Sequence, residues 1–194
     1  QVGNRMLGDR LATLVRFEKL RLAAAAVVLS PFLPMLFMGE EYGEQAPFQY
    51  FTSHSDEALI EAVRKGRLEE FDDFEWKGEA PDPHDEETFR RSKLRWSLLG
   101  EQRHRELRDL YRELFRIRRA TPSLRSLDLG AVETQADDDR RTLLVRRGDC
   151  VIAFNFGDEE QRVPVSGSFL IETGARMEGG RLVLPPATFA VIRT

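Results

Sequence analysis

The first forty residues combine helical spacing with continuous apolar runs. Apolar side chains recur at helical intervals over residues 11–15 and become continuous over residues 22–29. This pattern predicts one helix, amphipathic at first and buried later, with Asp9 as its N-cap. Ser30-Pro31 should end it, because proline cannot continue a helix. Residues 35–38, Met-Leu-Phe-Met, are apolar without alternation and predict a strand buried on both faces, as in an α/β fold.

No single hydrophobic period persists between residues 44 and 100. Two short helices are predicted inside this irregular insert, one capped by Ser55 and one beginning at residue 85 or 86. A stronger amphipathic pattern covers residues 107–117, and Thr121-Pro122 ends it.

After Pro122 the pattern changes to short apolar runs separated by turn residues. Gly and Asp pairs between the runs are typical of tight antiparallel turns. We predict an α/β part over residues 1–121 and an all-β antiparallel sandwich over residues 122–194. The expected strands are 143–145, 151–156, 163–165, 169–173, 182–184 and 189–192.

Composition limits the size and partners of this fold. The 194 residues are 41% hydrophobic and 32% charged, with a net charge of −4, so we expect no binding to nucleic acid or to an anionic membrane surface. Pro31 and Pro34 interrupt the apolar stretch 22–38, and no membrane span is expected. A complete (β/α)8 barrel takes about 250 residues, so the chain is too short for one plus a second domain.

Charge is unevenly distributed along the chain. Residues 69–87 hold ten acids and one base, and residues 88–119 hold eleven bases and four acids. We interpret both as solvated surface segments, because the bases do not form one stripe interleaved with aromatic residues. The alternative is an interaction protein whose binding to a charged partner weakens steeply with salt.

Thiol, metal and cofactor chemistry is sparse. Cys150 is the single cysteine, so there is no internal disulfide, and its predicted buried strand is typical of an inert thiol in a reducing cytoplasm. His54, His84 and His104 share no ligand spacing, so no metal site is predicted. Neither glycine-rich phosphate-binding motif occurs, and no cofactor is expected.

Aromatic residues follow an acidic loop. Glycosidases use carboxylates to protonate the leaving oxygen and to stabilise a cationic transition state, and sugar rings pack their C–H faces on aromatic rings. Glu40 and Glu41 are adjacent, so at most one faces a given pocket. The pattern is consistent with a sugar site, although each aromatic alone is more often part of a core. Six aromatics occur within 29 residues: Phe48, Tyr50, Phe51, Phe71, Phe74 and Trp76.

Several motifs resemble the alpha-amylase family of (β/α)8 barrels. The first are residues 1–5 (Gln-Val-Gly-Asn-Arg) and 35–43 (Met-Leu-Phe-Met-Gly-Glu-Glu-Tyr-Gly). The resemblance implies a C-terminal fragment of the barrel, with its last helices and eighth strand over residues 1–121, followed by a β-sandwich. Further motifs are similar to the members of that family that release trehalose from maltooligosyl trehalose: residues 48–54, 63–71, 76–83 and 92–96.

The resemblance also implies where the substrate lies. In that family an aspartate nucleophile, a glutamate proton donor and a second aspartate act together, and by the resemblance all three lie upstream of Gln1. No catalytic residue is therefore expected in residues 1–194, which alone should be inactive. The implied substrate is maltooligosyl trehalose or a related α-glucan, and a branching or debranching activity is the nearest alternative. The implied substrate-side residues are Gln1, Val2, Gly3 and Asn4, with Arg5 as a supporting charge and Glu41 and Tyr42 as weaker candidates.

An eighth barrel strand without its neighbours would expose its backbone and its apolar side chains. We therefore expect residues 1–194 alone to self-associate or to collapse onto their own helices. A non-catalytic carbohydrate-binding module is a further alternative. Residues 122–194 contain no Trp and no Tyr, so only phenylalanines in apolar strands could stack on a sugar.

Overall fold

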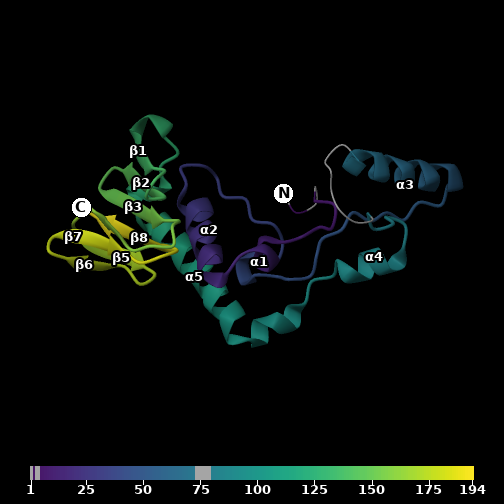
Figure 1. Cartoon of the computed structure of the whole chain (residues 1–194), viewed down its shortest axis with the longest axis horizontal. Coiled ribbons are helices and arrows are strands. Elements are labelled where there is room, and N and C mark those ends of the chain that lie inside the picture. The colour runs from purple at the N-terminus through teal and green to yellow at the C-terminus, as the bar shows by residue number, and fades with distance from the viewer. Residues whose placement is uncertain (1, 3–4, 73–79) are drawn as a thin grey trace. The chain divides into compact units, whose positions relative to one another are not determined.

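The structure, a computed structural model, describes residue 2, residues 5–72 and residues 80–194. The chain divides into two compact units (Figure 1). Unit 1 comprises residues 1–15 and 37–101, and unit 2 comprises residues 16–36 and 102–194.

Unit 1 is built from short helices joined by long loops. Asp56 accepts a hydrogen bond from the backbone N–H of Leu59 at 2.9 Å and so caps the helix that Ser55 was expected to cap. Asp85 caps the next helix, as predicted, by accepting from Glu87 at 2.9 Å. The elements are α1 (Leu11–Leu14), η2 (Glu40–Tyr42), α3 (Glu57–Asp72), α4 (Glu86–Arg91) and η3 (Trp96–Gly100).

Unit 2 combines helices with two antiparallel sheets. Helices α2 (Phe17–Leu29) and α5 (Gln102–Ala120) lie side by side against one face of the larger sheet (Figure 1). Their apolar stripes and the strand side chains form one core, which includes Leu22, Leu114 and Phe189. Two short elements, α6 (Pro122–Arg125) and η4 (Leu129–Ala131), connect α5 to the first strand.

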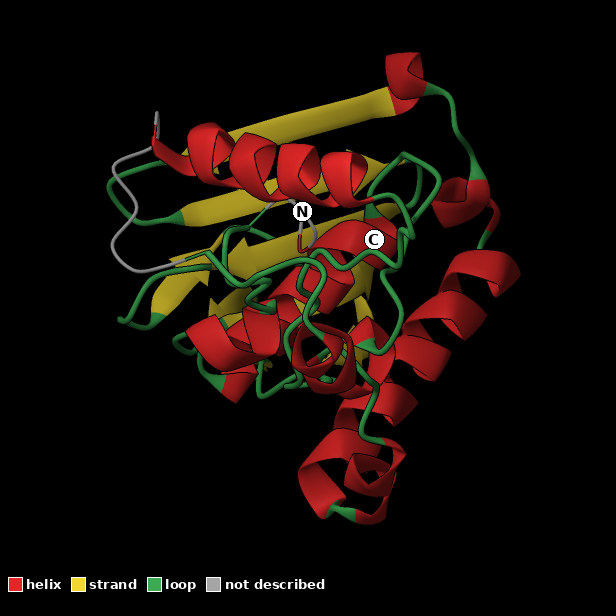
Figure 2. Cartoon of the chain, turned by 90° about the vertical axis from the view of Figure 1, so that its right-hand side faces the viewer, coloured by secondary structure: helices red, strands yellow, loops and turns green. Residues whose placement is uncertain are grey.

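The larger sheet has the order β1-β2-β3-β8-β5, and the smaller one has the order β4-β7-β6. Each neighbouring pair is antiparallel, and all described strands lie between Val132 and Arg193. Figure 2 shows the strands in yellow. Side chains from β3 and β8 meet β4 and β7 in a second core, which includes Val151, Leu182 and Ile192. The strands are β1 (Val132–Asp137), β2 (Thr142–Arg147), β3 (Cys150–Asn155), β4 (Gln161–Val163), β5 (Ser168–Glu172), β6 (Arg176–Glu178), β7 (Arg181–Leu184) and β8 (Thr188–Arg193).

The structure reproduces the strongest sequence patterns. The amphipathic pattern over residues 107–117 lies within α5, and five of the six predicted strands coincide with β2, β3, β5, β7 and β8. The run predicted at 163–165 overlaps β4 only at Val163, because β4 ends there. Two further strands, β1 and β6, were not predicted. The sequence assigned α2 and α5 to the part before residue 122, and in the structure both pack with the sheets.

Two local predictions are wrong. The single helix expected after Asp9 is interrupted, because Val15 is extended (φ −130°, ψ 160°) between α1 and α2. Residues 35–38 do not form a strand, and Met35 is 88% exposed rather than buried. A strand needs a hydrogen-bonded neighbour, and no described strand pairs with this segment.

Within the described residues, every helix is too short or too polar to cross a membrane.

Candidate functional site

The acidic loop that follows residues 35–38 is a tight turn around one carboxylate. Gly39 and Gly43 both have left-handed backbones, with φ of +84° and +72°. A Cβ atom on Gly39 would lie 2.7 Å from the Cβ of Glu44, so the turn requires glycine at this position. The loop backbone closes through a hydrogen bond of 2.9 Å from the N–H of Glu44 to the carbonyl of Gly39.

Glu44 lies at the centre of this loop with its side chain fully buried. One carboxylate oxygen accepts from the backbone N–H groups of Gln45 and Ala46, both at 2.8 Å. The other accepts from the Tyr42 hydroxyl at 2.8 Å and from the Arg95 backbone N–H at 2.6 Å. Burial raises the pKa of Glu44, but these hydrogen bonds outweigh it and hold the pKa below its ordinary value. Glu44 is therefore a satisfied buried anion that organises the loop.

Arg10 joins the two ends of the same loop. It is 4% exposed and donates to the carbonyl of Ala46 at 2.6 Å and to the carbonyl of Met38 at 2.7 Å. Its guanidinium also lies 5.2 Å from the ring centre of Phe37. Burial lowers the pKa of Arg10, and the negative charge of Glu44 opposes that shift. We call Arg10, Tyr42, Glu44 and Arg95 the Glu44 cluster.

The predicted substrate-side residue Tyr42 is part of this cluster. Tyr42 is 1% exposed, and its ring lies 5.8 Å from that of Trp96, which is 61% exposed. Burial, followed by the hydrogen bond to Glu44, raises the pKa of Tyr42. In this structure the Tyr42 hydroxyl donates to the carboxylate of Glu44 and so stabilises the loop. The neighbouring Glu41 is partly exposed.

The predicted residues 1–5 are only partly described: Gln1, Gly3 and Asn4 lie outside the described residues. Val2 is partly exposed, and Arg5 lies 3.5 Å from the carboxylate of Asp9.

The segment that follows Arg5 contacts the end of the acidic loop. Phe48 donates its backbone N–H to the carbonyl of Gly8 at 2.8 Å. A Cβ atom on Gly8 (φ +67°) would lie 2.3 Å from the carbonyl oxygen of Phe48. The structure thus brings Gly8, shortly after the N-terminal motif, against Phe48, the first residue of the motif 48–54, within unit 1.

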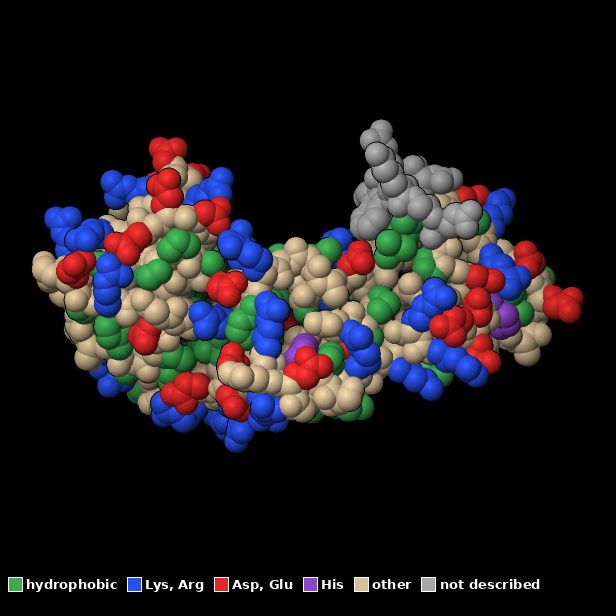
Figure 3. Space-filling view, turned by 60° about the horizontal axis from the view of Figure 1, so that its bottom comes forward, with side chains coloured by type: hydrophobic (Ala, Val, Ile, Leu, Met, Phe, Trp, Pro, Cys, Tyr) green, Lys and Arg blue, Asp and Glu red, His purple; other side chains and the backbone are tan. Residues whose placement is uncertain are grey.

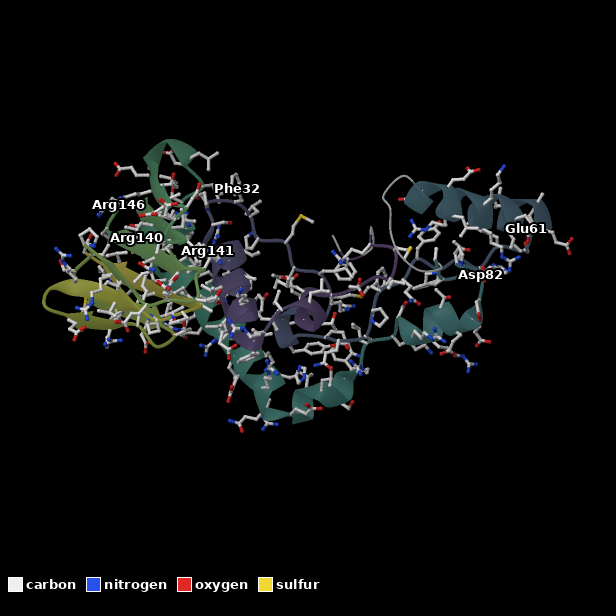
Figure 4. The ribbon with its side chains drawn as sticks, in the orientation of Figure 1. Phe32, Glu61, Asp82, Arg140, Arg141 and Arg146 are labelled. Atoms are coloured by element: carbon white, nitrogen blue, oxygen red, sulfur yellow. The ribbon has the colours of Figure 1, made fainter. Side chains whose placement is uncertain are left out.

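Two further motifs from the sequence meet in unit 1. Arg64 of α3 donates to both carboxylate oxygens of Asp82, with nitrogen–oxygen distances of 2.9 to 3.0 Å, and also pairs with Glu61 at 2.5 Å. Glu61 and Asp82 are labelled in Figure 4. Asp82 accepts the backbone N–H of His84 as well. The hydrogen bond from Arg64 is the main cause of the lowered pKa of Asp82. This pair attaches α3 to the segment that precedes α4.

The aromatic residues after the loop form a chain of edge-to-face contacts. Ring centres are 5.0 Å apart for Phe37 and Phe48, 6.0 Å for Phe48 and Phe51, and 5.1 Å for Phe51 and Phe89. Tyr50 is 43% exposed and carries the guanidinium of Arg67 at 4.8 Å. Phe74 and Trp76, together with the side chain of Phe71, lie outside the described residues.

Charge and metal chemistry add no second site in the described part of the chain. Acidic and basic side chains are interspersed on the face in Figure 3, and the pairs Arg90–Glu86 and Arg116–Glu113 lie at 2.7 and 2.5 Å. Among the described residues, no group of three His, Cys, Asp or Glu side chains is placed to hold a metal ion.

The sequence did not single out Glu44 or Arg10, and it included Arg95 only as one residue of the motif 92–96. Glu44 follows Glu40 and Glu41 in the same acidic loop, and nothing local distinguishes the buried carboxylate from its exposed neighbours. Near Glu44, the sequence signals a tight turn through Gly39 and Gly43, which flank η2 and have left-handed backbones in the structure.

Comparison with known proteins finds relatives that match along the whole chain. A family model described as a domain of unknown function (DUF3459) matches residues 127–191. The malto-oligosyltrehalose trehalohydrolase of Rhizobium sp. (strain M-11) is 42% identical over 197 aligned residues, covering 100% of this chain and 33% of the relative. That of Brevibacterium helvolum is 41% identical, with 100% and 34% coverage.

The chain resembles the C-terminal portion of the malto-oligosyltrehalose trehalohydrolases. It spans about a third of the length of these relatives. The trehalohydrolase of Saccharolobus solfataricus is 34% identical over 90% of this chain. The resemblance to the alpha-amylase family predicted from residues 1–5 and 35–43 is confirmed.

Solved structures agree with this similarity. The crystal structure of a candidate alpha amylase from Salmonella typhimurium has a TM-score of 0.85 and 33% identity, and the match covers 99% of this chain and 33% of that one. A debranching enzyme from Nostoc punctiforme has a TM-score of 0.54 at 18% identity, covering 96% of this chain and 33% of that one, and it shows a shared fold.

Proposed function

We propose that this chain is the C-terminal part of a glycoside hydrolase that cleaves the α-1,4 bond next to the trehalose end of maltooligosyl trehalose and releases trehalose. The observation that carries the proposal is 42% identity to a malto-oligosyltrehalose trehalohydrolase across the whole of this chain. By the family resemblance the three catalytic acids lie upstream of Gln1. The residues present here would therefore position the substrate side of the site, and residues 1–194 alone would be inactive.

The proposal gives residues 35–38 a structural role. We infer that residues 1–121 are the last part of a (β/α)8 barrel and that residues 35–38 are its eighth strand, followed by the β-sandwich over residues 122–194. Two features support this inference: Met35 is 88% exposed, and buried polar atoms of Arg10 (Nη2) and Gln49 (Oε1) have no partner among the described residues. Barrel strands on either side would cover the apolar side chains and supply hydrogen-bonding groups.

In this arrangement the Glu44 cluster holds the loop at the C-terminal end of the eighth strand, where barrel enzymes place their active sites. Arg10 ties Met38 to Ala46, and Glu44 fixes the turn between them. Glu41 is the more accessible of the two predicted loop residues, and Tyr42 would act from beneath it. The proposed N-terminal contribution to the same side of the site comes from residues 1–5: Gln1, Val2, Gly3, Asn4 and Arg5. We also propose a cytoplasmic location.

The proposal is tested with the full-length protein and maltooligosyl trehalose. Trehalose should appear together with a shortened maltooligosaccharide, whereas residues 1–194 alone should release neither. Release of glucose or of plain maltooligosaccharides without trehalose would contradict the specific assignment. Transfer of chains to new α-1,6 branches would instead favour a branching enzyme of the same family.

A further inference from the structure

A groove of about 310 Å³ lies in unit 2, on the larger sheet. It forms where residues 164–165, directly after β4, approach β1, β2 and the start of β3. Its volume is at the lower end of the range for small-molecule sites, about 300 to 1,000 Å³. No function described above uses it.

Strand register places five of the lining residues on one face of this sheet. Glu133 on β1 is directly opposite Arg146 on β2, and Arg146 is opposite Val151 on β3. Gln135 is opposite Leu144 in the same way. Residues directly opposed in an antiparallel pair project to the same side of the sheet. The groove is therefore built mainly on paired strands, and residues 164–165, which follow β4, line its other side.

The groove has an apolar floor and a polar rim. Val151 and Val165, which are 1% and 5% exposed, close the bottom of the groove but offer almost no surface. The apolar surface that a ligand can touch comes from the partly exposed Leu144 and the exposed Pro164. On the rim, Glu133 and Arg146 are exposed, and Arg146 is labelled in Figure 4.

The polar rim is free to bind. Among the described residues, the side chains of Glu133, Gln135 and Arg146 make no hydrogen bond or ion pair. Their donors and acceptors face solvent around an apolar floor, so a ligand could bond to them without breaking an internal interaction.

We propose that this groove binds a neutral oligosaccharide, with the C–H face of one sugar ring on Leu144 and Pro164 and its hydroxyl groups bonded to Glu133, Gln135 and Arg146. Glu133 and Arg146 give the rim one negative and one positive charge. Glu133 therefore repels an anionic ligand, and Arg146 repels a cationic one. A neutral ligand rich in hydroxyl groups uses both charged side chains as well as the amide. The identification of the sugar as an α-1,4-glucan rests on the proposed function.

The aliphatic floor predicts weak binding. It lacks the aromatic face that strengthens sugar stacking, so we expect a dissociation constant in the millimolar range. The site modifies the expectation that the β-sheet part could bind sugar only through its phenylalanines: here the contact surface is aliphatic, and the specificity comes from the polar rim.

The experiment is a titration of ¹⁵N-labelled residues 1–194 with maltotriose, followed by amide chemical shifts, in a chain that carries Met35→Asp to reduce self-association through the exposed apolar segment. We expect saturable shifts confined to residues 133–135, 144–146, 151 and 164–165. Arg146→Met and Gln135→Ala should each weaken binding about fivefold, because each removes hydrogen bonds to the ligand. Both side chains are exposed, so neither change should unfold the sheet, and unchanged shifts elsewhere verify this.

A matched control is Arg181→Met, which removes an exposed arginine from β7 outside the groove and should leave the affinity unchanged. Glucuronate and glucosamine test the preference for a neutral ligand and should each bind more weakly than glucose. The inference is overturned if maltotriose causes no saturable shift in the groove, or if Arg146→Met and Arg181→Met behave alike. Failure here leaves trehalose release by the full-length protein unaffected, so the two proposals are tested separately.

Discussion

Arg118 and Arg147 donate to the same backbone oxygen, the carbonyl of Ser30, at 2.7 and 3.1 Å. Arg118 projects from α5 and Arg147 from β2, and together they bond the carbonyls that end α2. Burial lowers the pKa of both arginines, and for Arg147 the nearby charge of Arg118 adds to that effect. Two cations at the C-terminus of a helix complement its dipole, and here they fix the direction of the chain as it leaves α2.

Replacing Arg118 should destabilise unit 2. Arg118 donates to the carbonyls of Val28, Ser30 and Phe32 at 2.5 to 2.7 Å, and Arg118→Met would leave these acceptors unpaired. We expect a loss of about 3 kcal/mol in the free energy of unfolding, measured by urea denaturation. The matched control, Arg119→Met, changes an exposed neighbour and should cost less than about 0.5 kcal/mol. Equal effects of the two changes would refute the role given to Arg118.

Replacing Glu44 should loosen the acidic loop. Glu44→Gln keeps the size of the side chain but removes its charge and places an NH₂ group against the backbone donors of Gln45, Ala46 and Arg95. We expect a loss of about 2 to 3 kcal/mol and faster hydrogen exchange across residues 39–46. Glu41→Gln, which changes a partly exposed carboxylate in the same loop, should leave the exchange rates nearly unchanged.

The stabilisation from Glu44 should depend on pH in one direction. Its pKa is lower in the folded protein than the ordinary value of 4.5, so the folded state favours the ionised form. The contribution is complete above the unfolded pKa and is lost as pH falls through the folded pKa. The stability difference between the wild-type chain and Glu44→Gln should therefore shrink below about pH 4.5. A difference that stays constant from pH 7 to pH 3 would contradict the assignment of the buried anion.

The ion pair between Arg64 and Asp82 should contribute modestly. Both side chains are more than a third exposed, so solvent screens their attraction. A double-mutant cycle of Arg64→Met and Asp82→Asn should give a coupling energy of about 0.5 to 1 kcal/mol. Hydrogen exchange in α3 provides a second measurement, since loss of either partner should release the helix from the loop. Independent, additive effects would show that the pair does not hold α3.

The elements that could be predicted are those whose own side chains carry the signal. In α5 the buried residues Leu107, Leu114 and Ile117 recur at helical spacing, and β3 and β8 are apolar along almost their whole length. By contrast, β1 has an exposed and polar sequence, Val-Glu-Thr-Gln-Ala-Asp. Backbone pairing with β2 alone makes it a strand, and such pairing leaves no pattern in the side chains of an edge strand.

The same limit applies to the site. The resemblance located the loop at residues 39–43, because its glycines and acids are contiguous. The burial of Glu44 depends on Arg95, which lies 51 residues later in the chain, and no local pattern reports such a contact. Segment 35–38 shows the reverse case. Its apolar sequence predicts a strand, and the prediction is wrong for this structure, because a strand forms only where a neighbouring strand is present.

Residues 1–194 alone should self-associate through the exposed apolar segment that follows α2. Phe32, Leu33 and Met35 are 60%, 75% and 88% exposed, and contiguous apolar surface of this kind favours association in water. Met35→Asp should shift the sedimentation profile toward monomer and reduce binding of a hydrophobic dye. The control Arg181→Met lies on β7 in the sheet region and should change neither quantity. A wild-type chain that sediments as a single monomeric species and binds no dye would show that the segment is satisfied within the chain itself, which would also remove the main structural support for an eighth barrel strand at residues 35–38.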